Sequence, residues 1–212
     1  MSDFVMNKDQ EPLERRADEL REDLFQRDVN QLSQLTGTTL QTEDGVNIFE
    51  FSYWGKPVLL SSHDYLARDA ETQGLLPPIH QAMILYYFHS SKGSPPRGNW
   101  ISFSELADGQ FYNSAFQGYT AQKIAQYFQM DYDKFETRNE EQCGEKVEFG
   151  DGAYRYQILP QIAMLIVYWK GDEEFPPSYK ILFEDIADYH LPTDGCAILG
   201  SMLVGKLIAE KY

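Results

Sequence analysis

The sequence predicts an α+β fold: a single domain with a mainly antiparallel sheet packed with several helices, including a long N-terminal and a C-terminal helix. Helix-like and strand-like segments come in blocks rather than in strict alternation, which favours antiparallel pairing over βαβ units. Tight-turn residues separate neighbouring strand-like segments, as hairpins require. The 212 residues, 42% of them hydrophobic, can bury one core. We predict one domain over residues 12–212, after a flexible N-terminus at residues 1–11.

The first third of the chain predicts a helix followed by a meander of strands. Residues 12–36 carry leucines at near-helical spacing among charged residues, and Gly37 is a natural stop. Residues 38–62 predict three strands joined by tight turns at Asp44-Gly45 and Gly55-Lys56. Alternation places three aromatic residues on one face of the middle strand: Phe49, Phe51 and Tyr53.

The rest of the chain predicts further helices around a second group of strands. Pro77-Pro78 can open a buried helix, and helices are also expected at residues 114–129 and, as an acidic arm, at 131–142. Strands are expected at residues 153–159 and 163–171, after a hairpin signal at Gly150-Asp151-Gly152, and residues 179–186 are expected to begin either a strand or a helix. A final helix is expected from Thr193 to Lys211, where small residues at intervals let it approach a neighbour closely.

Charge and composition exclude several classes of protein. The net charge is −15, so the chain should repel nucleic-acid phosphates and anionic membranes. Two cysteines, Cys143 and Cys196, are too few for a disulfide framework or a four-cysteine metal site. The N-terminus lacks the apolar segment of a signal peptide, and the longest apolar run, Ile162–Trp169, is too short to span a membrane. We expect a soluble, cytoplasmic protein.

The segment GDEEFPPSY, residues 171–179, is the first candidate site. Its three consecutive carboxylates, Asp172, Glu173 and Glu174, suit a hard cation such as calcium or magnesium, although adjacent residues do not all face one point. They also suit acid–base catalysis. Alternatively, they form a solvated turn, stiffened by the two prolines that follow Phe175. The Phe175–Pro176 bond is of the kind that can be cis.

The histidines supply one weak acid–base candidate. The four are His63, His80, His89 and His190, and none belongs to an HxxxH or HExxH pattern. His63 and Asp64 form the best local pair, but neighbouring residues of a strand point in opposite directions. Surface or core histidines are the simpler interpretation.

An aromatic group in the central stretch is the third candidate site. Its members could line a pocket for a planar or apolar ligand, or belong to an ordinary core. They are Tyr86, Tyr87, Phe88, Trp100, Phe103, Phe111 and Tyr112.

Three segments together resemble one prokaryotic family, the domain of unknown function 3786: WISFSEL-x-x-GQFY at residues 100–112, residues 150–186, and LPTDG at residues 191–195. The most specific string is GDEEFPPS. The resemblance implies no settled activity. Some relatives resemble fusions to iron–sulfur modules and are associated with anaerobic or corrinoid metabolism, whereas the two cysteines here cannot build such a module.

Three hypotheses follow from these observations. The first is an accessory or binding protein with an aromatic-lined pocket near the acidic loop, including Tyr87 and Trp100, which serves metalloenzyme or tetrapyrrole metabolism and binds a protein partner or a small planar ligand. The second is a metal-dependent or acid–base enzyme that uses the carboxylates of residues 171–178 with His63. The third is an acidic adaptor for a basic protein. The sequence specifies no cofactor.

Overall fold

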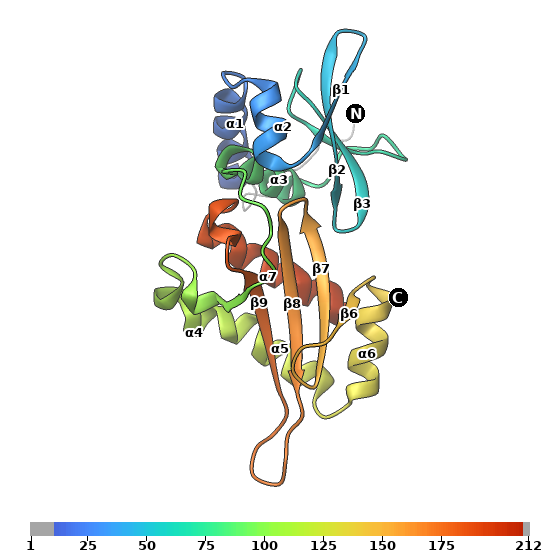
Figure 1. Ribbon diagram of the computed structural model, residues 1–212, viewed down its shortest axis with the longest axis vertical. Coiled ribbons are helices and arrows are strands. Elements are labelled where there is room, and N and C mark those ends of the chain that lie inside the picture. The colour runs from blue at the N-terminus through green and yellow to red at the C-terminus, as the bar shows by residue number, and fades with distance from the viewer. Residues whose placement is uncertain (1–10, 210–212) are drawn as a thin grey trace. The chain divides into compact units, whose positions relative to one another are not determined.

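The computed structural model describes residues 11–209, which form two compact units (Figure 1). Unit 1 comprises residues up to 94 together with 189–191, and unit 2 comprises residues 95–188 and those from 192 onward. Each unit contains one antiparallel sheet, so the predicted α+β class is confirmed, with two sheets rather than one. The N-terminus predicted to be flexible lies, apart from Glu11, outside the described residues.

Unit 1 is a four-stranded meander with helices packed on it. The strands, in spatial order, are β1 (Thr39–Glu43), β2 (Val46–Tyr53), β3 (Lys56–Ser61) and β4 (Ala67–Asp69). The helices are α1 (Glu11–Leu24), α2 (Val29–Thr36) and α3 (Pro78–Ser90). The meander is therefore as predicted, with one short additional strand.

The turns of this meander follow from residues that tolerate a left-handed backbone. Asp44 and Gly45 have φ of 49° and 81° and connect β1 to β2 as predicted. The second turn is Trp54-Gly55, with φ of 52° and 75°, one residue earlier than predicted. Two consecutive positive φ values are those of a type I′ hairpin turn.

The predicted helix at residues 12–36 is wrong as a single element. It breaks after Leu24, and α2 begins at Val29. The Asp28 side chain caps the new helix by accepting a hydrogen bond from the Gln31 backbone N–H at 2.8 Å. Gly37 ends α2 with φ of 63°, as the sequence indicated.

The core of unit 1 lies between β2 and α3. Phe49, Phe51 and Tyr53 are all buried, which confirms the predicted face. The ring centroid of Phe88 on α3 lies 5.0 Å from that of Phe49 and 5.6 Å from that of Phe51. Aromatic pairs at such distances stabilise beyond their buried area.

Unit 2 is a five-stranded sheet with helices on one face. The strands, in spatial order, are β5 (Trp100–Ser102), β9 (Ser178–Glu184), β8 (Ile162–Trp169), β7 (Gly152–Leu159) and β6 (Glu145–Val147). The helices are α4 (Gly109–Tyr119), α5 (Ala121–Phe128), α6 (Tyr132–Glu141) and α7 (Thr193–Ile208). Short 3₁₀ helices occur at Phe103–Glu105 and Ala187–Tyr189.

The predicted helix at residues 114–129 is also two elements. α4 ends at Tyr119, and the hydroxyl of the buried Thr120 donates to the Phe116 carbonyl. Such a bond from a side chain to the backbone competes with the regular helical pattern. The acidic helical arm and the last helix are confirmed, with α7 ending at Ile208.

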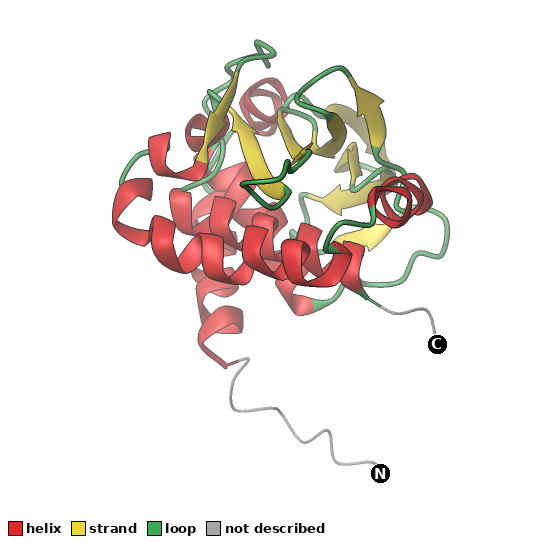
Figure 2. Cartoon of the chain, turned by 90° about the horizontal axis from the view of Figure 1, so that it is seen from below, coloured by secondary structure: helices red, strands yellow, loops and turns green. Residues whose placement is uncertain are grey.

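Aromatic contacts attach the helices to one face of this sheet, behind the strands in Figure 1 and as a separate layer in Figure 2. Phe183 of β9 lies 5.9 Å from Phe116 of α4, and Tyr168 of β8 lies 5.9 Å from Phe135 of α6. Helix α7 approaches α4 closely, since a Cβ added at Gly200 would lie 2.6 Å from the Phe116 ring. The opposite face of the sheet carries the candidate site.

Candidate ligand-binding site

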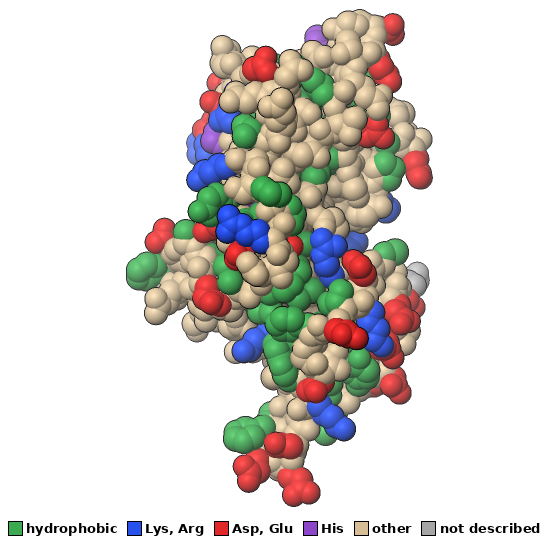
Figure 3. All heavy atoms as spheres, viewed as in Figure 1, with side chains coloured by type: hydrophobic (Ala, Val, Ile, Leu, Met, Phe, Trp, Pro, Cys, Tyr) green, Lys and Arg blue, Asp and Glu red, His purple; other side chains and the backbone are tan. Residues whose placement is uncertain are grey.

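The face of the unit 2 sheet opposite its helices carries a small apolar cluster. Its buried members come from the three central strands: Ala153, Leu165, Val167 and Leu182. Three partly buried side chains pack against them: Trp100, Val147 and Trp169. Antiparallel register explains the grouping, because Leu165 is the partner of Leu182, and Val167 is the partner of Ala153. In Figure 3, hydrophobic side chains gather over the strands of unit 2.

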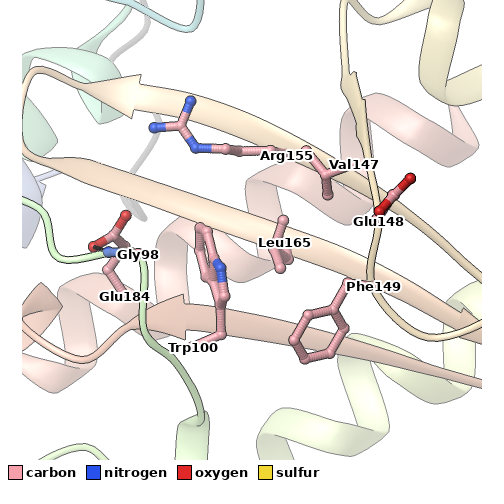
Figure 4. A pocket seen from close by; sticks show the side chains of 8 residues that line it. All are labelled: Gly98, Trp100, Val147, Glu148, Phe149, Arg155, Leu165 and Glu184. Carbon is pink, nitrogen blue, oxygen red and sulfur yellow. Dashed lines mark hydrogen bonds between the residues drawn. The ribbon is translucent and has the colours of Figure 1, made fainter.

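A hollow of about 390 Å³ lies on this apolar cluster, and every strand of the sheet contributes to it (Figure 4). Its lining residues are Gly98, Trp100, Val147, Glu148, Phe149, Arg155, Leu165 and Glu184. All of them belong to unit 2. A volume of a few hundred Å³ with mixed apolar and polar walls is typical of small-molecule sites.

Aromatic rings form the apolar part of the hollow. Trp100 on β5 is half-buried, and Phe149, in the connection between β6 and β7, is 38% exposed. Leu165 of β8 lies between these two rings in Figure 4. The arrangement offers a flat ligand two rings and an aliphatic side chain to contact.

Arg155 supplies the positive charge of the hollow. Its Nη1 lies 3.3 Å from the Glu145 carboxylate, and its Nη2 donates to the Gln157 side chain. Glu145 is mostly exposed, so this ion pair is weak. A guanidinium has five N–H donors, which leaves Arg155 able to bind an acidic group of a ligand.

Two acidic residues, Glu148 and Glu184, also belong to the lining, and Glu184 is only 2% exposed. Its Oε2 accepts hydrogen bonds from the backbone N–H groups of Arg97, at 3.0 Å, and Gly98, at 3.2 Å. The loop before β5 thus holds the carboxyl group at the edge of the hollow.

The acidic loop lies at the end of the β8–β9 hairpin and does not line the hollow. Asp172, Glu173, Glu174 and Phe175 are exposed, and Figure 3 shows carboxylates gathered at this tip. The Asp172 Oδ1 accepts backbone hydrogen bonds from Phe175, at 2.8 Å, and Glu174, at 2.9 Å. These bonds lower the pKa of Asp172. The Phe175–Pro176 bond is trans.

The predicted aromatic group is divided between the two units. Tyr87 is buried in α3 of unit 1, where its hydroxyl donates to the Thr36 carbonyl at 2.5 Å. Trp100 lines the hollow of unit 2. Phe111 and Tyr112 are exposed on α4, by 83% and 64%. Of this group, Trp100 lies in the hollow, whereas Tyr87, Phe88 and Phe103 are buried, as in the alternative of an ordinary core.

The pair His63 and Asp64 lies between β3 and β4, with His63 exposed. Burial tends to raise the pKa of Asp64, but hydrogen bonds from Arg68, at 2.7 Å, and the Leu66 N–H outweigh it and lower the pKa. Asp64 is thus held by Arg68. Catalytic roles for this pair stay a prediction.

Neither metal sites nor membrane spans appear among residues 11–209. Among the side chains that the structure describes, no group of three or more His, Cys, Asp or Glu could hold a metal ion. No helix in the same range is long and apolar enough to cross a membrane. Cys196 is buried, and burial raises the pKa of its thiol well above the ordinary value, as expected of an inert core cysteine.

A family model described as a domain of unknown function (DUF3786) matches residues 28–206. The chain belongs to this family. The matched range includes the sheets of both units, the hollow and the acidic loop. Comparisons with curated proteins and with solved structures gave no match.

Sequence reasoning missed Arg155, Phe149 and Glu184 as site residues. Arg155 lies within, and Glu184 at the end of, a mostly buried strand, GAYRYQIL and SYKILFE respectively. A charged residue in such a strand was the available signal, because burial of a charge requires a partner or a function. Phe149 had no comparable signal, since its position depends on how the β6–β7 connection folds.

Proposed function

We propose that this protein is a binding protein without catalysis of its own, whose unit 2 hollow takes a flat, largely apolar ligand with an acidic group. The observation that supports this most strongly is the placement of Trp100 and Arg155 around one hollow with an apolar base. An aromatic ring recognises a flat apolar ligand, and a guanidinium recognises a carboxylate.

Tetrapyrroles are one ligand class with these properties, because they are planar and carry carboxylates. A tetrapyrrole ligand would agree with the expectation of a role in metalloenzyme or tetrapyrrole metabolism. Smaller aromatic acids have the same two features and suit a hollow of about 390 Å³. Both classes belong in the first binding panel.

Isothermal titration calorimetry with a porphyrin dicarboxylate and a set of aromatic acids tests the proposal. We expect Trp100→Ala to weaken binding by about fivefold or more, because stacking on one ring contributes about 1 kcal/mol or more. Trp100→Phe, which keeps a ring, should retain part of the affinity. Phe111→Ala is the matched control, because Phe111 is exposed outside the hollow. Absence of binding across the panel, or equal affinity in all variants, would contradict the proposal.

The adaptor hypothesis remains a second candidate because of the hairpin tip. Phe175 is 67% exposed beside three exposed carboxylates. An exposed aromatic residue with surrounding charge suits a basic protein surface with an apolar groove. The enzyme hypothesis, with Asp172, Glu173 or Glu174 as metal ligand or base, stays a prediction.

A further inference from the structure

Glu184 is buried on the hollow side of the sheet although its side chain is acidic. Trp100 is its register partner on β5, so both side chains stand on the same face. Glutamate is almost never fully buried unless it is paired. Among the described side chains, no lysine or arginine forms an ion pair with Glu184, and the carboxyl group relies on two backbone N–H groups.

Both of those hydrogen bonds reach the same oxygen, Oε2. A carboxylate has two oxygens with about four acceptor sites, so Oε1 keeps the capacity to accept from a group in the hollow that Glu184 lines. Figure 4 shows the carboxyl group beside Gly98 at the margin of the space around Trp100. Removing an acidic group from water is costly unless its acceptors are used.

Arg155 lies across the hollow from Glu184. Arg155 is the partner of Leu165 on β8, Leu165 is the partner of Leu182 on β9, and Glu184 lies two residues further along that strand. Two strand spacings separate β7 from β9 by about 10 Å. A ligand of moderate size can therefore contact a guanidinium at one end and a carboxyl group at the other.

We propose that Glu184 selects ligands that carry an amino group or a ring N–H in addition to their acidic group. This inference rests on the proposed binding function and specifies its ligand class as aromatic, acidic and N–H-donating. The acidic group binds Arg155, the flat ring lies against Trp100, and the N–H donor binds Glu184. A charge-assisted hydrogen bond of this kind discriminates strongly against a ligand that lacks the donor.

Calorimetry with tryptophan, indole-3-propionate and 1-methylindole-3-propionate tests the inference, because these acids differ in their N–H donors. We expect tryptophan and indole-3-propionate to bind about tenfold more tightly than the N-methylated acid, because their ring N–H lies at the opposite end of the molecule from the carboxylate. In Glu184→Gln the advantage of indole-3-propionate over the N-methylated acid should fall below about threefold, while binding of the N-methylated acid itself changes by less than about twofold. The amide oxygen that this substitution introduces would still accept from the N–H groups of Arg97 and Gly98, so the variant should fold.

The controls separate this inference from the proposed function. Glu43→Gln, at an exposed position of unit 1, should leave all three affinities unchanged. Binding that depends on Trp100 but not on Glu184 would overturn the inference and leave the binding function intact. Equal affinity of the unmodified protein for indole-3-propionate and for its N-methylated form would also overturn it. If neither the three acids nor the porphyrin bound, both the inference about Glu184 and the proposed binding function would be overturned.

Discussion

Asp172, the first of the three consecutive acidic residues, stabilises the turn of the acidic loop through its side chain. Its side chain accepts the backbone N–H groups of Glu174 and Phe175, and its own N–H donates to the Phe175 carbonyl at 2.9 Å. The carboxylate thereby performs the role that a backbone carbonyl has in an ordinary turn. A series of three acidic residues is therefore not uniform, because its first member shapes the turn and the other two remain exposed.

We expect the Asp172 carboxyl to titrate below the ordinary aspartate pKa of about 3.9. Its folded-state pKa is lowered by the two backbone hydrogen bonds, so they are present above that value and weaken as pH falls through the folded-state pKa. NMR titration of the side-chain carboxyl and of the Glu174 and Phe175 amides measures this. In Asp172→Asn, which keeps an acceptor, the amide shifts should lose this titration. A midpoint at or above 3.9 would contradict the assignment.

At the scale of elements, the contact between α7 and α4 depends on a glycine. A Cβ at Gly200 would lie 2.6 Å from the Phe116 ring, whereas nothing lies within 4 Å of one at Gly205. Both glycines belong to α7, so they form a matched pair in one helix.

Gly200→Ala should lower the free energy of unfolding by about 1–3 kcal/mol, because the added methyl group overpacks the contact with Phe116. Gly205→Ala should raise it by about 0.5–1 kcal/mol, because alanine is the better helix former in open space. Urea unfolding followed by circular dichroism measures both. Equal effects of the two substitutions would mean that the α4–α7 contact is looser than the structure indicates.

Elements bounded by strong turn residues could be predicted from the sequence, and those bounded by side-chain hydrogen bonds could not. Asp44-Gly45 marked its hairpin because both positions need a left-handed backbone. The break before α2 depends on capping by Asp28, and the break after α4 on Thr120. Aspartate and threonine also occur inside continuous helices of other proteins. Whether such a residue ends a helix therefore depends on the packing around it.

The candidate site shows the same limit. Trp100 was a candidate because of its residue type, but Arg155 and Glu184 join it only through the register of four strands. Strand order β5-β9-β8-β7-β6 brings together residues that are far apart in the chain. The spacing of residues along the chain does not specify that strand order. For this reason the acidic loop, and not the hollow, was the more prominent candidate site in the sequence.

At the scale of the whole molecule, the net charge of −15 acts on a charged partner at longer range than any direct contact does. Its long-range field speeds encounter with basic proteins and weakens as salt is added. If the adaptor hypothesis is correct, the exposed hairpin tip concentrates this effect. If only the net charge matters, removing three charges from any surface weakens partner binding equally. If the hairpin tip is a specific site, only removal of its own charges weakens binding.

Neutralising the tip with Asp172→Asn, Glu173→Gln and Glu174→Gln changes the net charge from −15 to −15 + 3 = −12. We expect this variant to lose partners that the unmodified protein retains from host extract at low salt and releases at high salt. The matched control, Glu43→Gln, Asp44→Asn and Glu71→Gln, removes three exposed charges from unit 1 and should retain them. Equal retention by both variants would contradict a specific tip.

The positions of the tryptophans give each unit its own chromophore. Trp54 lies in the β2–β3 turn of unit 1, whereas Trp100 and Trp169 both pack on the apolar cluster of unit 2. Indole fluorescence from the Trp54→Phe variant would therefore originate in unit 2 alone. A red shift of this fluorescence would report the exposure of the apolar cluster to water as unit 2 unfolds. The protein thus carries an intrinsic optical reporter for asking whether its two units melt together or one after the other.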